Sequence, residues 1–235
     1  LLLAQCRIKA DLQAQMGRPI QSNIFDFIES LGLSLKENLV LDERCGSVTV
    51  MQSMGFFRVD SQVQYPFFPS IQRFGDHLTV DGLEQIRMLY TSEIGYEAED
   101  PPRVTPLFTT SNRSGVMGGG FYNLMPMENP AFKALAQPGK VVGVAITVES
   151  DSTASVSQAI LVSDSRFFAD DGGGVFPENS VFVANAVDFL MGDSDLVALR
   201  SREITTRPLE QIGDAEKARW KWANILLPPF LIVGY

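Results

Sequence analysis

Three stretches of continuous apolar character constrain the fold of this chain more than any other feature of its sequence. They are LLLAQCRI at residues 1–8, KVVGVAITVES at 140–150 and SQAILVSDSRFF at 157–168. A strand with one face in water alternates apolar and polar side chains, whereas a strand buried on both faces is a continuous apolar run. We therefore expect core strands at these positions and, at residues 1–8, burial of both strand faces.

Helical patterns alternate with these strands at both ends of the chain. SNIFDFIESLGL at 22–33 begins at a Ser/Asn cap, has apolar residues at helical spacing and ends at Gly32. NSVFVANAVDFLMGD at 179–193 predicts an amphipathic helix with Asn179 as its cap. Its apolar stripe consists of residues 182, 183, 186, 189 and 190. This alternation predicts an α/β fold with an open, mostly parallel sheet.

The middle of the chain follows a different pattern. Apolar residues recur with period two over 47–65, which predicts a hairpin or two adjoining strands. The whole strand-rich stretch from about 47 to 110 is therefore expected to be a β-rich insertion in the sheet. With this insertion, residues 1–212 predict a single α/β domain, and residues 213–235 are expected to form the start of a C-terminal membrane helix.

Proline and glycine set further expectations. PFFP at 66–69 is expected to exclude a central strand, and extended structure is expected to resume over 83–94. Residues 112–130 are expected to form a loop, followed by a single helical turn within 129–140. DLVALRSREI at 195–204 is expected to be a last strand.

The charge of the chain argues against a nucleic-acid partner. The formal net charge is −9, and such a surface repels a phosphate backbone. Only residues 198–235 have a small basic excess, with six Lys or Arg and four Asp or Glu, next to the apolar C-terminal stretch. The two cysteines, Cys6 and Cys45, form neither a disulfide framework nor a zinc pattern, although a single bridge between them stays open.

The sequence predicts no catalytic, cofactor-binding or metal-binding residue. The one histidine, His77, is expected in an exposed polar turn, and Cys45 lacks the preceding glycine of a nucleophile elbow. The glycine-rich segments lack the spacing of a nucleotide-binding loop. An acidic set lacks the spacing of a calcium loop and is expected to be a solvated rim. Its members are Asp151, Asp164, Asp170, Asp171 and Glu178.

Asp164 is the one weak candidate for a ligand site. It ends an expected central strand, and open α/β sheets bind ligands beyond the carboxyl ends of their strands. The alternative role for this side chain is to cap the following turn.

The C-terminal stretch RWKWANILLPPFLIVGY has the composition of a membrane boundary. Trp220 and Trp222 flank Lys221, and amphipathic rings beside a cation are typical of the membrane interface. Pro228 and Pro229 follow within an apolar run that is shorter than the roughly 20 residues of a spanning helix. These five residues predict a membrane anchor, and a tail docked in the core is the alternative.

Several segments, taken in order, resemble one known family. They are SNIFDFIESLGLSLKENLVLDERCG, QYPFFP, LFTTSNRSG, ILVSDSRFF, NSVFVANAVDFLMGDSDLVALRSREITTRPL and KWANILLPPFLIV. These segments resemble the auxiliary proteins of an uncharacterised ABC-type transport system, known best as gliding-motility-associated auxiliary components. A related domain occurs in intraflagellar transport proteins, and its α/β core is similar to the class I glutamine amidotransferase fold.

The resemblance implies a location and partners. Family members typically have an N-terminal span, an extracytoplasmic domain and a C-terminal span just after the motif that corresponds here to Asn224–Pro229. It therefore implies an inner-membrane protein whose soluble domain lies on the periplasmic side. The implied partners are the permease and ATPase subunits of the transporter, while ATP hydrolysis by this chain is not implied. No catalytic residue is carried over.

These observations leave three alternative functions for the chain. The first is a non-enzymatic, membrane-anchored auxiliary subunit that acts by protein contact or cargo binding. The second is an amidotransferase-like hydrolase that uses Cys45 or a serine with His77. The third is a saccharide- or peptide-binding module that uses the aromatic residues of the β-rich stretch. These aromatic residues are Phe56, Phe57, Tyr65, Phe67 and Phe68.

Overall fold

The computed structural model of the chain forms two compact units, Leu1–Ile204 and Thr205–Tyr235. The residues that the structure describes are 1–54, 57–97, 103–133, 135–149, 156–169, 176–193 and 218–225. All but the last of these ranges belong to the first unit. In the second unit, residues 218–225 are helical.

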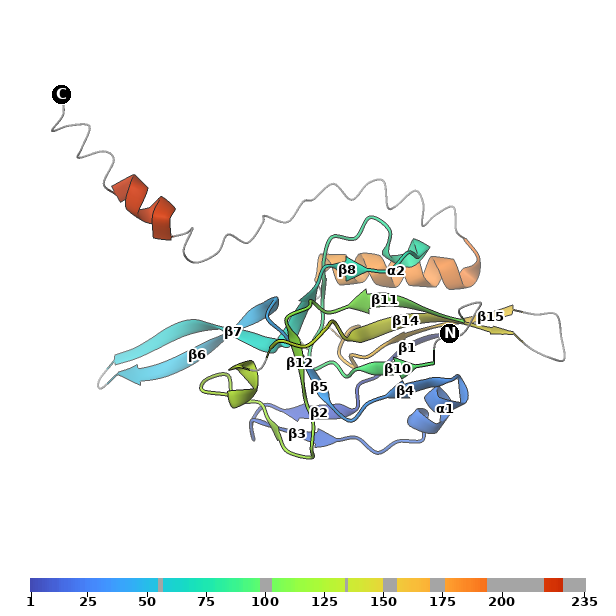
Figure 1. The fold of residues 1–235 in the computed structure, drawn as a ribbon, viewed down its shortest axis with the longest axis horizontal. Helices are drawn as coiled ribbons and strands as arrows, with labels where there is room; N and C mark the ends of the chain where they lie inside the picture. Colours follow the sequence, from blue (N-terminus) through green and yellow to red (C-terminus); the bar gives the residue numbers. More distant parts are fainter. Residues whose placement is uncertain are drawn as a thin grey trace, which may run out of the picture. The chain divides into compact units, whose positions relative to one another are not determined.

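A five-stranded sheet forms the centre of the first unit (Figure 1). Its strands, in spatial order, are β1 (Leu2–Ala4), β15 (Val156–Val162), β14 (Val141–Glu149), β11 (Val104–Thr109) and β8 (Arg73–Phe74). Of the four pairings, only that of β1 with β15 is parallel. The expected α/β class is therefore confirmed, but the expectation of a mostly parallel sheet is wrong.

The short connection between β14 and β15 explains the antiparallel arrangement. Six residues separate Glu149 from Val156, whereas a parallel crossover needs a dozen or more. The two strands therefore pair as a hairpin, from Gly143 opposite Val162 to Glu149 opposite Val156. A core similar to that of class I glutamine amidotransferases is not confirmed by this sheet.

Both faces of the central strands are buried. On one face, Ile160 and Val162 pack with Phe182 of α2 (Pro177–Met191). On the other face, Ala159 and Leu161 pack with Phe25 and Ile28 of α1 (Ile24–Ser30). Figure 1 shows these helices on opposite sides of the sheet. The two continuous apolar runs at 140–150 and 157–168 are thus confirmed as core strands.

Strand β1 is less buried than its sequence predicts. All three of its residues are half-buried, because β1 is the outermost strand on its side of the sheet. The expectation that residues 1–8 form a strand buried on both faces is therefore wrong. Burial instead becomes complete just after the strand, at Cys6 and Ile8.

Helix α2 begins two residues before its expected cap. Pro177 is its first residue, and Asn179 lies within the first turn. The amide of Asn179 accepts the backbone N–H of Arg87 at 3.0 Å and donates to the Arg87 carbonyl at 2.7 Å. The side chain expected to cap the helix instead joins α2 to β9 (Ile86–Arg87). The predicted apolar stripe is confirmed, since Phe182 and its companions pack in the core.

The expected hairpin in the middle of the chain is confirmed as β6 (Cys45–Met54) and β7 (Phe57–Ile71). Contrary to expectation, β7 continues through the PFFP segment. A bulge makes this continuation feasible, because the register shifts between the pairs Cys45–Pro69 and Ser47–Gln64. Proline is tolerated at bulges, where no ladder hydrogen bond is lost.

The stretch expected to be a loop, 112–130, contains two short strands. β12 (Ser114–Met117) pairs with β5 (Leu39–Asp42), and β13 (Tyr122–Asn123) pairs with β3 (Met16–Pro19). β3 also pairs with β2 (Ile8–Asp11). Turn-forming residues dominate the local composition, so these pairings with distant strands have no local signal.

Extended structure over 83–94 is formed only in part. The described strands there are β9 and the first residue of β10 (Ile94–Tyr96), which pairs with β4 (Leu33–Leu35). The remaining elements are two short 3-10 helices, η1 (Leu78–Val80) and η2 (Pro130–Lys133). The second is the single helical turn that the sequence predicts.

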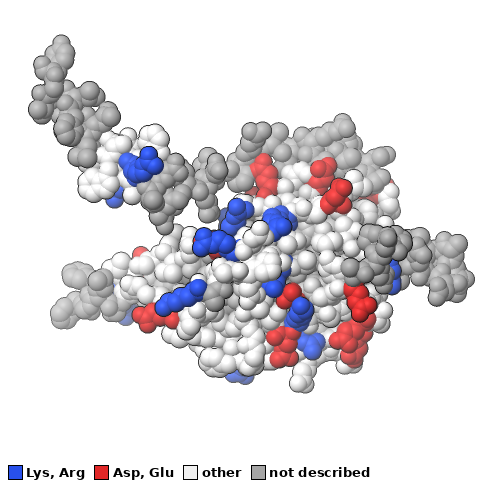
Figure 2. Space-filling model, viewed as in Figure 1, with Lys and Arg blue, Asp and Glu red and all other residues white. Residues whose placement is uncertain are grey.

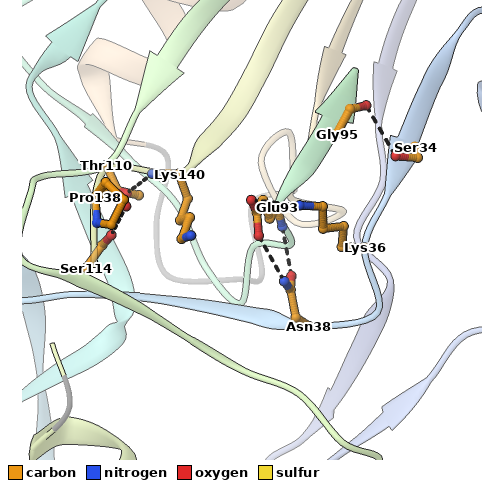
Figure 3. Close-up of polar contacts among 9 residues, drawn as sticks. All are labelled: Ser34, Lys36, Asn38, Glu93, Gly95, Thr110, Ser114, Pro138 and Lys140. Atoms are coloured by element: carbon orange, nitrogen blue, oxygen red, sulfur yellow. Dashed lines mark hydrogen bonds and ion pairs between the residues drawn. The ribbon is translucent and has the colours of Figure 1, made fainter. Parts of the chain in front are cut away.

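Polar contacts fix the chain between β4 and β5 against the residue before β10 (Figure 3). The amide of Asn38 accepts the backbone N–H of Glu93 at 3.0 Å and donates to the Glu93 carboxylate at 3.2 Å. Lys36 forms an ion pair with the other carboxylate oxygen at 3.0 Å. These contacts fix Glu93, which follows shortly after Leu89 and Tyr90, two lining residues of the cavity described below.

Candidate functional site

The parallel pair β1 and β15 brings two distant segments together at the carboxyl ends of the strands. After β1, the backbone N–H of Gln5 donates to the Val162 carbonyl at 2.9 Å. The next residue, Cys6, is buried, and its Sγ lies 3.2 Å from the Oγ of Ser165. The Cys6 thiol also lies 3.1 Å from the Ile8 carbonyl, to which it donates. The residues that follow the carboxyl ends of β1 and β15 therefore form one wall of a shared site.

Asp164 directly precedes Ser165 and is buried. Its side chain is 1% exposed, and its carboxylate accepts the backbone N–H groups of Leu89 at 2.7 Å and Arg166 at 2.8 Å. Burial raises the pKa of Asp164 to about 7, while the two N–H donors and the Arg166 charge oppose that rise. The carboxylate thus caps the turn after β15 and also fixes the segment after β9.

Tyr90 occupies an uncommon backbone conformation beside Asp164. Its φ is +54°, in the left-handed region that non-glycine residues rarely adopt. The flanking contacts hold it there: Asp164 binds the N–H of Leu89, and the N–H of Tyr90 donates to the Phe67 carbonyl at 3.0 Å. Burial raises the pKa of the Tyr90 hydroxyl, which stays protonated at neutral pH. Local strain of this kind is maintained only where surrounding contacts determine it.

These segments line an open cavity of about 330 Å³, which we call the β1/β15 cavity. Two of its lining residues, Lys9 and Arg166, are basic, and none is acidic. The complete lining is Cys6, Ile8, Lys9, Ala10, Leu12, Ile20, Leu89, Tyr90, Ser165 and Arg166. Its volume lies at the lower end of the range for small-molecule sites. Asp164 is adjacent to the cavity through Leu89 and Arg166, but it does not itself line it.

Cys45 and His77 do not form a catalytic pair among the described residues. Nδ1 of His77 lies 2.9 Å from the Oγ1 of Thr79 and accepts the Thr79 backbone N–H, so the ring caps η1. The His77 ring also contacts that of Phe189, and burial lowers its pKa. Within the described part of the chain, no Cys or Ser side chain is hydrogen-bonded to this imidazole. His77 is half-buried, not in an exposed turn as expected.

The thiol of Cys45 is poorly suited to nucleophilic chemistry. Burial raises its pKa to about 11, and the nearby charges of Asp42 and Glu43 act in the same direction. Since the thiolate is the nucleophile, very little of the reactive form exists at neutral pH. Cys6 and Cys45 are both free, which answers the question of a bridge between them.

The described aromatic residues of the β-rich stretch, Tyr65, Phe67 and Phe68, pack together in the core. Tyr65 and Phe67 are buried, and Tyr65 Oη donates to the Leu124 carbonyl at 2.6 Å. Phe68 is half-buried and packs edge-to-face against Tyr65 at 4.8 Å between ring centroids. These three rings therefore form no exposed saccharide platform, while Phe56 and the side chain of Phe57 lie outside the described residues.

The part of the chain that the structure describes contains no group of three or more metal-ligating side chains.

The expected membrane anchor is only partly described. Trp220, Lys221 and Trp222 lie in the helical stretch 218–225, and the two indole side chains are 62% and 59% exposed. Pro228 and Pro229 lie outside the described residues, as do the strand expected at 195–204 and the acidic residues Asp151, Asp170 and Asp171. No helix in the described ranges is long and apolar enough to cross a membrane.

The cavity and the sheet that positions it coincide with a region of known sequence similarity. A sequence profile of the family described as an ABC-type uncharacterized transport system matches residues 1–193. The chain belongs to this family. The matched region contains all the lining residues of the β1/β15 cavity. The expectation of an auxiliary component of an ABC-type transport system is supported by this match, while the links to gliding motility and intraflagellar transport stay predictions.

One curated relative is similar to most of the chain. An uncharacterized protein of Borreliella burgdorferi is 23% identical over 236 residues, which cover 92% of this chain and 45% of that protein. The chain thus spans less than half the length of this relative.

The sequence predicts Asp164 as a ligand-site candidate, because it follows a core strand, and the structure places it next to the cavity but not in its lining. The sequence does not point to the residues that do line the cavity. Cys6, Lys9 and Arg166 carried no motif that marks a binding site. The usable signal was the pair of apolar strands at 1–8 and 157–168, because parallel strands place their carboxyl ends at one edge of a sheet.

Proposed function

We propose that this chain is a non-enzymatic, extracytoplasmic domain of a membrane-anchored auxiliary subunit of an ABC-type transport system. It acts by contact with the permease or ATPase subunits, or by binding cargo. The observation that carries this proposal is the family match over residues 1–193. Residues 213–235 would then begin the C-terminal membrane helix, with the domain on the periplasmic side of the inner membrane.

The described side chains are compatible with a role in contact and binding. His77 binds Thr79 and not a nucleophile, and the pKa of Cys45 is raised to about 11. The indole rings of Trp220 and Trp222 are exposed, as expected for residues that meet a membrane interface. These features favour the auxiliary role over the amidotransferase-like hydrolase.

Nucleic acid is not among the proposed partners. The net charge of the chain is −9, and a phosphate backbone requires basic surface. On the face drawn in Figure 2, basic and acidic side chains are interspersed, and neither sign forms a continuous patch there. Charged contacts to a protein partner suit such a mixed surface better than contacts to a polyanion.

Co-purification from membranes tests this proposal. The full-length protein would be tagged, extracted in mild detergent from membranes of cells that produce it, and its companions identified by mass spectrometry. We expect permease and ATPase subunits of one ABC-type system in stoichiometric amounts. Release of the full-length protein by carbonate washing, without any transporter subunit attached, would overturn the proposal. Protease accessibility in intact and broken spheroplasts tests the periplasmic location separately.

A further inference from the structure

We propose that the β1/β15 cavity binds a small organic anion with an apolar body, such as a medium-chain carboxylate. This assignment goes beyond the proposed function, because it concerns the chemistry of the cavity and does not depend on the location of the protein in the cell. It depends on three features: cations without acidic partners, apolar walls, and a rigid, strained backbone beside them.

The basic residues at the cavity lack anionic partners. Lys9 lies directly opposite Arg18 in the antiparallel register of β2 and β3. Side chains of directly paired residues project from the same face of a ribbon, and like charges in such a pair are destabilising. Neither residue, nor Arg166, forms an ion pair with a carboxylate in the described part of the chain. The two cations that line the cavity, Lys9 and Arg166, are therefore available to pair with a bound anion.

The acidic residue closest in sequence to Arg166 is Asp164, and its carboxylate already binds backbone N–H groups. Asp164 is buried, and both of its carboxylate oxygens accept backbone N–H groups. It forms no ion pair with the Arg166 guanidinium and does not line the cavity. The guanidinium of Arg166 is therefore available to an incoming carboxylate, for which its planar fork of N–H donors is well suited.

The walls of the cavity favour an apolar body over a bare inorganic ion. Five of the ten lining residues are aliphatic: Ile8, Ala10, Leu12, Ile20 and Leu89. Leu12 is 56% exposed and Ile20 is half-buried, so a ligand would cover apolar surface that water now contacts. Burial of such surface contributes about 25 cal/mol per Å², which a phosphate or sulfate ion cannot gain.

The cavity is pre-formed by contacts independent of any ligand. The carboxylate of Asp164 and the carbonyl of Phe67 hold Leu89 and Tyr90, including the left-handed backbone at φ +54°. On the opposite wall, the thiol of Cys6 lies 3.2 Å from the exposed hydroxyl of Ser165. Pre-organised walls reduce the entropy lost on binding, so a small ligand is sufficient.

Calorimetric titration of the full chain with four probes tests this assignment. The probes are octanoate, N-acetyl-leucine, octanol and inorganic phosphate. Octanoate and N-acetyl-leucine share a carboxylate and an apolar body and distinguish an acyl-chain ligand from a peptide-like one. We expect at least one of them to bind about tenfold more tightly than octanol and than phosphate, which corresponds to about 1.4 kcal/mol.

Variants locate the binding. Arg166→Gln and Lys9→Gln should each weaken binding of the carboxylate several-fold, and Ala10→Phe should abolish it by filling the cavity. Lys133→Gln, an exposed cation in η2, is the matched control and should have no effect. Circular dichroism and thermal unfolding establish that each variant is folded, and chemical-shift changes at Leu89 and Ser165 locate the ligand even if Ala10→Phe does not fold.

Several results would overturn the assignment. Equal affinity for octanol and octanoate, together with unchanged binding by Arg166→Gln, would mean that the cavity binds apolar molecules without recognising a carboxylate. Equal affinity for phosphate would mean a general anion site. Absence of binding by every probe at 10-millimolar order, roughly 3 kcal/mol of affinity, would remove the site altogether. None of these results bears on co-purification with transporter subunits, so the two proposals fail independently.

Discussion

The carboxylate of Asp164 binds the backbone N–H of Leu89 at 2.7 Å and thereby joins the end of β15 to a segment 75 residues earlier in the chain. A second N–H, from Arg166, binds the other carboxylate oxygen at 2.8 Å. One buried side chain thus positions both walls of the β1/β15 cavity. The first prediction concerns what happens when its charge or its hydrogen bonds are changed.

Replacement of Asp164 by Asn should destabilise the protein at pH 4 by about 1–3 kcal/mol, because the amide can accept only one of the two N–H groups and leaves the other unpaired. Burial raises the pKa of Asp164 to about 7, above its usual value of 3.8. The folded state therefore holds this proton more tightly than the unfolded state does. The stabilising contribution is fully present below pH 4 and is lost as the pH rises through about 7.

Urea unfolding of the wild type and Asp164→Asn at pH 4, 6 and 8 measures this effect. The difference in unfolding free energy between the two proteins should decrease as the pH rises. Asp60→Asn, at an exposed position of β7, is the control and should show no such trend. A difference that grows with pH would contradict the prediction and mean that the two N–H donors outweigh burial.

Asn179 connects helix α2 to β9 by two hydrogen bonds to the same residue. Its replacement by Ala should lower the unfolding free energy by about 1–3 kcal/mol, since the backbone N–H and C=O of Arg87 lose their partner. Ser180→Ala, at the exposed neighbouring position, should change it by less than about 0.5 kcal/mol. Chemical denaturation measures both values, and equal effects of the two substitutions would show that the contacts to Arg87 contribute nothing.

Gly143 allows β14 to pass close to the ring of Phe108. A Cβ at this position would lie 2.2 Å from Cδ2 of Phe108, which is fully buried and packs against Phe182. The ring also contacts Phe74 and Phe167, so a shift would disturb the core, and Gly143→Ala should cost about 1–3 kcal/mol through overpacking.

Gly46→Ala is the matched control for this glycine. Its Cβ would meet its nearest neighbour, Cβ of Phe68, at 3.6 Å, which is an ordinary contact. Thermal unfolding should therefore show a lower Tm for Gly143→Ala and a nearly unchanged Tm for Gly46→Ala. A similar Tm for the two variants would mean that the core around Phe108 is looser than its contacts indicate.

Local features of the fold were predictable from the sequence, whereas the direction of its strands was not. The apolar runs that contain Val144 and Leu161 identify core strands, because a strand that is buried on both faces has apolar side chains at successive positions. Likewise, Gly32, with φ +78°, marks the end of α1. Strand direction depends on pairing between segments, and the pairings that determined it had no local signal. For example, β11 pairs antiparallel with both β14 and β8.

The same division applies to the candidate site. The position of Asp164 at the end of a core strand was predictable, because it follows from one strand alone, whereas its role in ligand binding stays a prediction. Cys6 and Ser165 are 159 residues apart in sequence, and only the parallel pairing of β1 with β15 brings them together. The like-charge pair of Lys9 and Arg18 becomes visible only when the register of β2 and β3 is known. Asn179 shows a further limit, because a residue typical of a helix cap formed a tertiary contact instead.

Alkylation kinetics should distinguish Cys45 from an ordinary exposed thiol. Burial raises its pKa to about 11, so the thiolate is a minor species at pH 8. Iodoacetamide should label Cys45 slowly in the folded protein at that pH, with a rate that rises steeply toward pH 10. Mass spectrometry of peptides, with urea-unfolded protein as the control, measures this. Rapid labelling at pH 7 in the folded state would contradict the prediction and revive the cysteine-dependent hydrolase.

The two tryptophans provide a direct test of membrane contact. Trp220 and Trp222 are the only tryptophans of the chain, and their side chains are 62% and 59% exposed. In buffer, the fluorescence should therefore have the emission maximum of indole in water and be readily quenched by acrylamide. Vesicles that contain anionic lipid should shift the emission to shorter wavelength and protect the rings, because indole partitions into the interface.

Substitution of the intervening cation separates the two contributions to this binding. Each Lys or Arg near an anionic surface contributes about 1 kcal/mol, so Lys221→Gln should weaken partition to anionic vesicles roughly fivefold. Its affinity for neutral vesicles should stay the same, and Lys133→Gln should behave as the wild type toward both. If neither vesicle shifts the emission at a large excess of lipid, residues 218–225 do not contact the bilayer, and the anchor proposed for 213–235 loses its support.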